Sequence, residues 1–155
     1  MNGFRSLLLF VMLLSVAGIG WAADAGPLPE VVEFNRDIRP VLSENCFFCH
    51  GPDKNKRQAD LRLDTADGLV GKEGKPGTAV PGKPADSELF RRITSNDPEM
   101  KMPPHDSGKT LTDREIALLK KWIEQGAKYE GHWAFLPIKR AAEPEVRNPK
   151  LETRN

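Results

Sequence analysis

Several features that define common classes of protein are scarce in this sequence. The 155 residues contain only two cysteines, and aromatic residues make up 7% of the chain. No basic stripe indicates nucleic-acid binding, and no acidic block predicts a disordered tail. The sequence has no internal repeat. A core built only from its few large apolar side chains would be thin, so we expect another apolar component to contribute to it.

The N-terminal segment has the layout of a secretory signal peptide. Arg5 supplies a positive charge, residues 7–16 form an almost unbroken apolar run, and small residues lead to a cleavage site after Ala22. This run is shorter than the roughly 20 residues that span a bilayer. We expect residues 1–22 to be removed and the chain to be periplasmic or otherwise exported. An uncleaved anchor is the alternative.

The mature chain is formally neutral. Removing residues 1–22 takes away one arginine, which leaves 22 basic residues against 22 acidic ones. Charge alone therefore identifies no partner.

Cys46-Phe47-Phe48-Cys49-His50 has the Cys-x-x-Cys-His spacing that attaches a c-type haem. From the composition, this arrangement arises by chance about once in 4,000 such sequences. Residues three and four apart share a face of a helix. Cys46 and Cys49 can therefore each bind one vinyl group of the same haem, while His50 binds the iron through an imidazole nitrogen. The haem would also provide the missing apolar component.

Three other interpretations of these cysteines are weaker. A disulfide is the default for two cysteines in an exported protein. A thioredoxin-like redox motif would follow a strand and open a helix, whereas this motif closes a helical pattern. A zinc site needs two further ligands, and the remaining histidines, His105 and His132, are far apart in the sequence. For His132 we expect a surface or packing role.

The apolar pattern before the motif predicts a helix from Phe34 to Asn45, with Asn35 as its N-cap. Pro40 is tolerated near the start of the regular helix. One face of this helix is apolar: Ile38, Val41 and Leu42.

Residues 53–84 are expected to be mainly loop around the haem edge, because they are rich in Gly, Pro and charged residues. The alternation in residues 61–63 predicts a very short strand or an extended stretch. A second helix should run through Leu89 and Ile93, capped by Asp86 or Ser87 and ended by Pro98.

The last predicted helix has the clearest signals. Thr112 and Glu115 form a capping-box pattern, Leu111 precedes it as a staple residue, and Gly126 is the expected stop. Its apolar side chains are Ile116, Leu119 and Ile123, with Leu118 and Trp122 beside them.

Residues 98–105 contain the candidates for the second axial ligand. A thioether is a soft iron ligand, and Met/His coordination raises the haem potential. Met102 is favoured because the two prolines after it stiffen its loop. Met100 would point to the opposite side of an extended chain. Met100, His105 or an open position are the alternatives, and either methionine could simply pack in the cavity.

The order of these elements over residues 34–129 resembles a class I cytochrome c. Several segments are more specifically similar to the planctomycete-type cytochrome c domain: residues 34–40, 61–64, 81–84, 87–89, 102–104 and 132–135. The resemblance implies an all-α, cytochrome c-like fold of three to four helices with long loops around one covalent haem. In that fold the first and last helices cross and pack together. In that family the domain usually heads a longer secreted protein.

We therefore predict four parts: a signal peptide (1–22), a leader (23–33), a cytochrome c domain (34–130) and a C-terminal extension or truncated interdomain linker (131–155). Within the last part, Trp133 and Phe135 should fold back onto the domain, and residues 143–155 should be disordered.

The predicted function is haem binding and electron transfer, with one haem c iron per chain, bound by Cys46, Cys49, His50 and Met102. We expect no catalytic residues, since catalysis at iron needs an open position. We do not expect the chain to bind nucleic acid or to keep a stable membrane span. We do expect it to associate with further secreted domains. The alternatives are a haem-stabilised interaction or redox-sensing module, or the haem head of an oxidoreductase.

Overall fold

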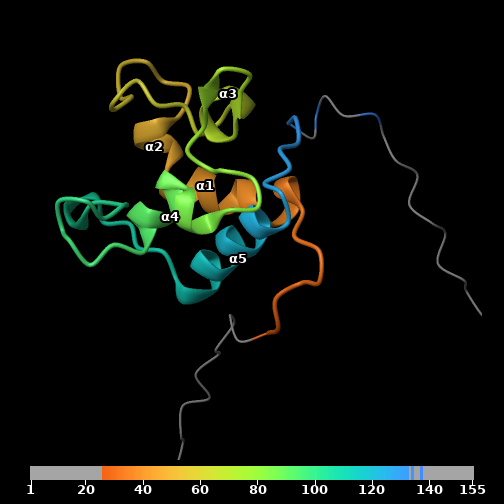
Figure 1. Cartoon of the computed structure of the whole chain (residues 1–155). Coiled ribbons are helices and arrows are strands. Elements are labelled where there is room, and N and C mark those ends of the chain that lie inside the picture. The colour runs from red at the N-terminus through yellow and green to blue at the C-terminus, as the bar shows by residue number, and fades with distance from the viewer. Residues whose placement is uncertain (1–25, 133, 135–136, 138–155) are drawn as a thin grey trace, which may run out of the picture.

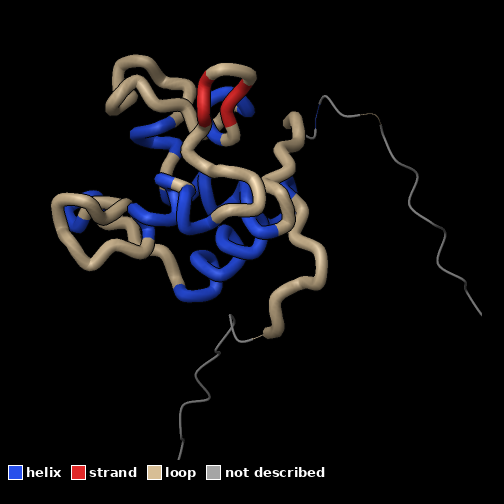
Figure 2. Tube along the Cα trace, viewed as in Figure 1, coloured by secondary structure: helices blue, strands red, loops and turns tan. Residues whose placement is uncertain are grey.

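The computed structural model describes residues 26–132, 134 and 137. This part of the chain is helical with long loops, and one two-stranded hairpin is its only sheet (Figures 1 and 2). The α-helices are α1 (Arg39–Asn45), α2 (Phe47–His50), α3 (Ala66–Leu69), α4 (Glu88–Ile93) and α5 (Asp113–Glu124). A π-helical turn, η1 (Phe34–Ile38), precedes α1, and two short 3-10 helices are η2 (Pro84–Asp86) and η3 (His105–Ser107). Strands β1 (Gly71–Lys72) and β2 (Lys75–Pro76) are antiparallel.

The first predicted helix is present as η1 followed directly by α1. Pro40 lies in the first turn of α1, where its missing N–H costs no helical hydrogen bond. The prediction of Asn35 as N-cap is wrong, because the helical turn already begins at Phe34. Asn35 is used in tertiary contacts instead: its side chain accepts from Arg39 Nε at 2.7 Å and donates to the Gly131 carbonyl at 2.8 Å.

The core forms where α5 packs against η1, the turn that leads directly into α1 in the middle of the molecule (Figure 1). The predicted contact between the first and last helices is confirmed. Ile116 is only partly buried, so it lies at the edge of the expected face. The residues that fill this seam are Phe34, Ile38, Val41, Leu42, Leu118, Leu119, Trp122 and Ile123.

Helix α5 begins and ends as predicted. Thr112 Oγ1 accepts from the Glu115 N–H at 3.2 Å, and Glu115 Oε2 accepts from the Thr112 N–H at 2.7 Å, which completes the capping box. After α5, Gly126 has a φ of 100°, a conformation that favours glycine. These are local signals, and the structure follows them.

The segment between α2 and α4 contains more structure than the sequence predicted. Helix α3 is capped by Thr65, whose hydroxyl accepts from the Gly68 N–H at 3.3 Å. Of the two predictions for residues 61–63, the short strand is not present. Leu63 is buried, and its amide donates to the His50 carbonyl at 2.8 Å, so this stretch pairs with the cysteine motif instead.

Helix α4 starts after Ser87, as predicted, and ends at Ile93, before Pro98. Ser87 does not cap it through its side chain. The Ser87 hydroxyl is fully buried, accepts from the Val80 N–H at 2.8 Å and donates to the Lys83 carbonyl at 2.8 Å. The serine therefore holds the preceding turn together.

The ends of the described chain are anchored on this helical core. Gln125 accepts from the Val32 N–H at 3.0 Å and donates to the Glu30 carbonyl at 2.8 Å. Arg39 donates to the Glu130 carbonyl at 2.8 Å. None of the helices in the described residues is long and apolar enough to cross a membrane. The predicted signal peptide, Trp133, Phe135 and residues 143–155 lie outside the described residues.

Candidate functional site

The Cys-x-x-Cys-His motif forms one helical turn. The Cys46 carbonyl accepts from the Cys49 N–H at 3.1 Å and from the His50 N–H at 2.8 Å. Cys46 itself continues α1, because its N–H donates to the Leu42 carbonyl at 2.8 Å. Both cysteines are free thiols. The spacing therefore presents the two cysteines and the histidine on neighbouring positions of a single turn, as the sequence predicted.

His50 has the properties of a metal ligand. Its Nδ1 is buried and has no hydrogen-bond partner among the described residues. Burial lowers the pKa of His50; a hydrogen bond with the Gln58 backbone opposes this shift, and the charge of Arg92 adds to it. The imidazole is therefore neutral at pH 7, with a nitrogen that can donate a lone pair to a metal. Leaving such an atom unpaired costs about 1–3 kcal/mol.

The backbone of the motif is held by the loop that follows it. The Gln58 N–H donates to the Cys49 carbonyl at 2.7 Å, and the Leu63 N–H donates to the His50 carbonyl at 2.8 Å. Further along, the Tyr129 hydroxyl donates to the Asp64 carbonyl at 2.9 Å. Residues distant in the sequence thus fix the orientation of the turn.

The Cys46 thiol does not have the character of a reactive dithiol. Its pKa is raised to about 12, mainly by burial and further by the negative charges of Glu115 and Cys49. Redox-active Cys-x-x-Cys pairs need a lowered thiol pKa. In the described part of the chain, no group of three or more His, Cys, Asp or Glu side chains is placed to hold a metal ion. The thioredoxin-like and zinc interpretations therefore find no support here.

The two phenylalanines inside the motif differ in environment. Phe47 packs against the core, whereas Phe48 is 69% exposed. Lys56 Nζ lies 4.7 Å from the centroid of the Phe48 ring. The turn therefore has one side in the core and the other in solvent.

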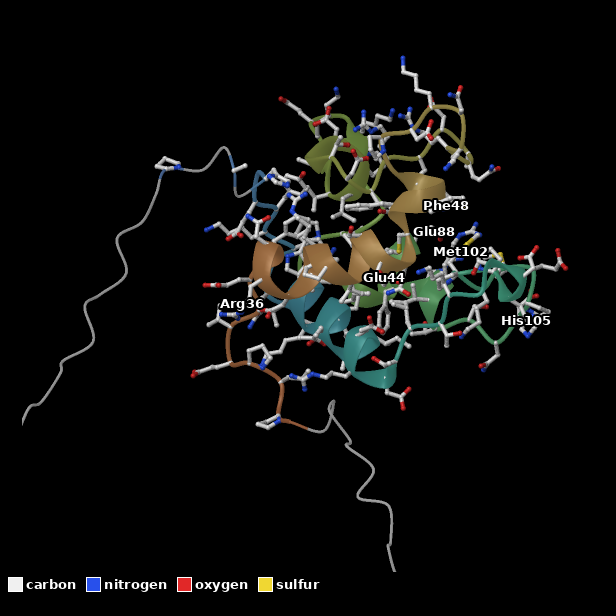
Figure 3. All side chains as sticks on the ribbon, turned by 180° about the vertical axis from the view of Figure 1, so that it is seen from behind. Arg36, Glu44, Phe48, Glu88, Met102 and His105 are labelled. Atoms are coloured by element: carbon white, nitrogen blue, oxygen red, sulfur yellow. The ribbon has the colours of Figure 1, made fainter. Side chains whose placement is uncertain are left out.

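Met102 lies on the loop between α4 and α5. Its N–H donates to the Arg92 carbonyl at 3.1 Å, which ties the residue to the end of α4, and its side chain is partly buried. Figure 3 shows Met102 on the part of the loop toward α2 and Phe48, with His105 at the outer end. His105 is exposed, while Met100 is partly buried. This arrangement favours Met102 over His105, and the ligand itself stays a prediction.

Comparison with known proteins adds the deciding observation. Residues 46–106 match the family model described as Planctomycete cytochrome C. This segment, less than half of the chain, resembles a planctomycete cytochrome c domain. The match begins at Cys46 and includes His50, α3, α4 and Met102. No curated protein and no solved structure matches the chain. The resemblance inferred from the sequence is therefore confirmed.

The side chains of the matched segment would fit a covalent haem. Two thiols three residues apart provide the attachment points, and the buried, unpartnered Nδ1 of His50 is explained by a metal ligand. Met102 would supply the opposite ligand. When bound, a haem supplies a one-electron iron couple and a large apolar surface.

The sequence analysis did not identify two charged residues that lie near the predicted ligands. Arg92 Nε donates to Glu88 Oε1 at 2.7 Å, and the Arg92 charge acts on His50. The i,i+4 spacing of Glu88 and Arg92 predicts an ion pair. Their spacing does not show that the charge of Arg92 acts on His50, which lies 42 positions earlier in the chain.

Proposed function

We propose that this chain is an exported, mono-haem c-type cytochrome that transfers electrons. The observation that carries the proposal is the one-turn Cys-x-x-Cys-His helix, which places the free thiols of Cys46 and Cys49 and the partly buried His50 on neighbouring positions. Cys46 and Cys49 hold the haem covalently, His50 is the proximal iron ligand and Met102 is the distal ligand.

Cys46 and Cys49 would each hold the haem through one thioether, the product of adding a thiol across a vinyl group without any change of oxidation state. His50 contributes a neutral imidazole, which burial favours. The Gln58 and Leu63 N–H groups donate to the Cys49 and His50 carbonyls and so hold the turn that carries His50.

Electron transfer is favoured over catalysis because Met102 would fill the second axial position. Enzymes that act at haem iron keep that position open. The Met102 N–H is held by the Arg92 carbonyl, which supports a fixed ligand rather than one that swings away. The partner is a redox protein of unknown identity, and export rests on the signal-peptide pattern of residues 1–22.

The direct test is expression of the full chain in a host that matures c-type cytochromes. The protein should keep its haem on a denaturing gel, gain the mass of one haem, and be reduced and reoxidised reversibly by a redox mediator. The ferrous protein should bind carbon monoxide poorly, because both axial positions are filled. Protein without covalent haem would overturn haem attachment, and rapid carbon monoxide binding would favour a catalytic role instead.

A further inference from the structure

Phe48 is a large apolar side chain that the described fold leaves in solvent. It is 69% exposed, and among the described residues Val31, at 63%, is the only other large hydrophobic residue that is exposed. The other four residues of the Cys-x-x-Cys-His turn are partly buried. Figure 3 shows Phe48 on the side of the molecule where Met102 lies. A single exposed apolar residue is common on a protein surface, but the surroundings of Phe48 distinguish it.

The helical period places Phe48 opposite the residues that would attach the haem. Successive residues of a helix are turned by about 100°, so Cys46, Cys49 and His50 share one face of the turn and Phe48 occupies the other. A group bound by those three side chains would leave the Phe48 ring uncovered. A protein that covers the ring would be separated from the attachment residues only by the thickness of one helix, about 10 Å with its side chains.

The loop after the motif holds a positive charge against this ring. Lys56 Nζ lies 4.7 Å from the centroid of the Phe48 ring, a distance typical of a cation–π contact. Arg57 fixes the loop, because its Nε donates to the Gly51 carbonyl and its Nη2 to the Pro52 carbonyl, each at 3.0 Å. The Arg57 side chain is only 9% exposed. The ring and the ammonium group are therefore held together before any partner binds.

The charge beside the ring is available to a partner. Lys54 and Lys56 are exposed, and neither forms an ion pair with a carboxylate of the described chain. Asp60 is already paired with Arg57 at 3.3 Å. Asp53 is the remaining acid of this loop, and it accepts from a backbone N–H of the same loop at 2.9 Å. Two lysines against one carboxylate leave the surface around the ring positive.

We propose that Phe48 and Lys56 form the contact through which the haem-loaded chain docks on its redox partner, a protein surface with an apolar pocket bordered by carboxylates. This inference rests on the proposed function. The pocket would remove the ring from water, and buried aromatic side chains contribute much of the affinity of an interface. The carboxylates would attract the lysines and orient the two proteins. A lipid surface fits less well, because one ring and two lysines supply little apolar area and charge.

The test uses gold electrodes coated with alkanethiols as probes of defined chemistry. One coating ends in carboxylates only, and the other mixes carboxylate and methyl ends to imitate the proposed partner. Cyclic voltammetry measures how much of the haem-loaded full chain binds and exchanges electrons. The wild type should bind the mixed coating several-fold better, and Phe48→Ser should abolish that advantage while Phe48→Leu keeps most of it. Lys56→Gln should weaken binding to both coatings.

Val31→Ser is the matched control, because it removes an apolar side chain of similar exposure outside the motif turn. It should bind like the wild type. Equal losses in Val31→Ser and Phe48→Ser would overturn the proposal, as would wild-type binding in Phe48→Ser. Binding of the wild type to vesicles of anionic phospholipid that Phe48→Ser abolishes would assign the ring to a membrane and would also overturn it.

Covalent haem is checked first on a denaturing gel. Its absence from the wild-type protein would refute the proposed function, whereas a haem-loaded Phe48→Ser with unchanged binding would refute only the docking role. If Phe48→Ser does not incorporate haem, Lys56→Gln decides, because wild-type binding in that variant overturns the proposal.

Discussion

The ring of Phe34 packs against the indole of Trp122, with centroids 5.6 Å apart and planes inclined by 39°. Phe34 also contacts Tyr129 at a centroid distance of 4.6 Å, and the Trp122 indole N–H donates to the Lys128 carbonyl at 3.0 Å. One tryptophan thus connects the first helical turn, the last helix and the segment after it.

Replacing Trp122 by alanine should reduce the free energy of unfolding by about 3–5 kcal/mol, the usual cost of truncating an aromatic side chain in a core. Trp122 is 1% exposed, so truncating it would leave a cavity that little solvent can fill. Urea unfolding of the haem-loaded protein measures the loss. Lys120→Ala, at an exposed pair with Glu124, is the control and should change stability by less than about 0.5 kcal/mol. A loss below about 1 kcal/mol at Trp122 would contradict the packing described here.

Covalent haem should depend on both cysteines of the motif. Cys46→Ser and Cys49→Ser should each leave one thioether and weaken haem retention on a denaturing gel, and the double variant should lose it. Ser43→Ala, an exposed position of α1, should retain haem like the wild type. Full retention in the double variant would show that the haem is attached elsewhere or is not covalent.

Met102 and Met100 can be separated by spectroscopy. Methionine-bound ferric haem has a weak charge-transfer band at the red end of the visible spectrum, which Met102→Ala should remove. The same variant should have a lower reduction potential, because the thioether ligand raises it. Met100→Ala should keep both properties. Loss of the band in Met100→Ala alone would transfer the ligand assignment to Met100.

Asp37 should contribute to acid sensitivity. Its pKa is lowered from 3.8, first by the hydrogen bond from Arg36, against the opposing effect of burial, and then by the Glu33 N–H and the Arg36 charge. A lowered folded-state pKa gives stability that is present above the unfolded-state pKa and lost as the pH falls through the folded-state value.

Asp37→Asn should therefore be less stable than the wild type at pH 7 by about 1 kcal/mol, and the two proteins should converge as the pH falls well below 3.8. Thermal or urea unfolding between pH 7 and pH 2 measures this. Asp67→Asn is the control, because that carboxylate is 62% exposed in its pair with Lys72. A constant difference between Asp37→Asn and the wild type at all pH values would contradict the assignment.

Ser87→Ala should destabilise the protein by about 1–3 kcal/mol, because it removes two hydrogen bonds made by a fully buried hydroxyl. The groups concerned belong to Val80 and Lys83. Ser87→Thr keeps the hydroxyl but adds a methyl group at a fully buried position, so it should not rescue stability completely. Urea unfolding compares both with Ser43→Ala, which should stay within about 0.5 kcal/mol of the wild type.

The sequence by itself determined those features whose interacting residues lie within one helical turn of each other. The Cys46–His50 spacing predicted the haem site, because three residues within one turn define its chemistry. The Thr112–Glu115 capping box and Gly126 placed α5 correctly for the same reason. The apolar period located the buried side chains of the first and last helices, because one face of each had to be covered.

The tertiary structure decided the roles of polar residues whose partners are distant in the chain. Asn35 and Ser87 fit the pattern of helix caps, yet their side chains bind Gly131 and the turn before α4. Arg92 pairs locally with Glu88, but its effect on His50 depends on how α4 packs near α2. A polar side chain has several satisfactory partners of similar energy, and local propensity does not choose among them. Only the packing of distant segments, which buries one arrangement and excludes the others, makes that choice.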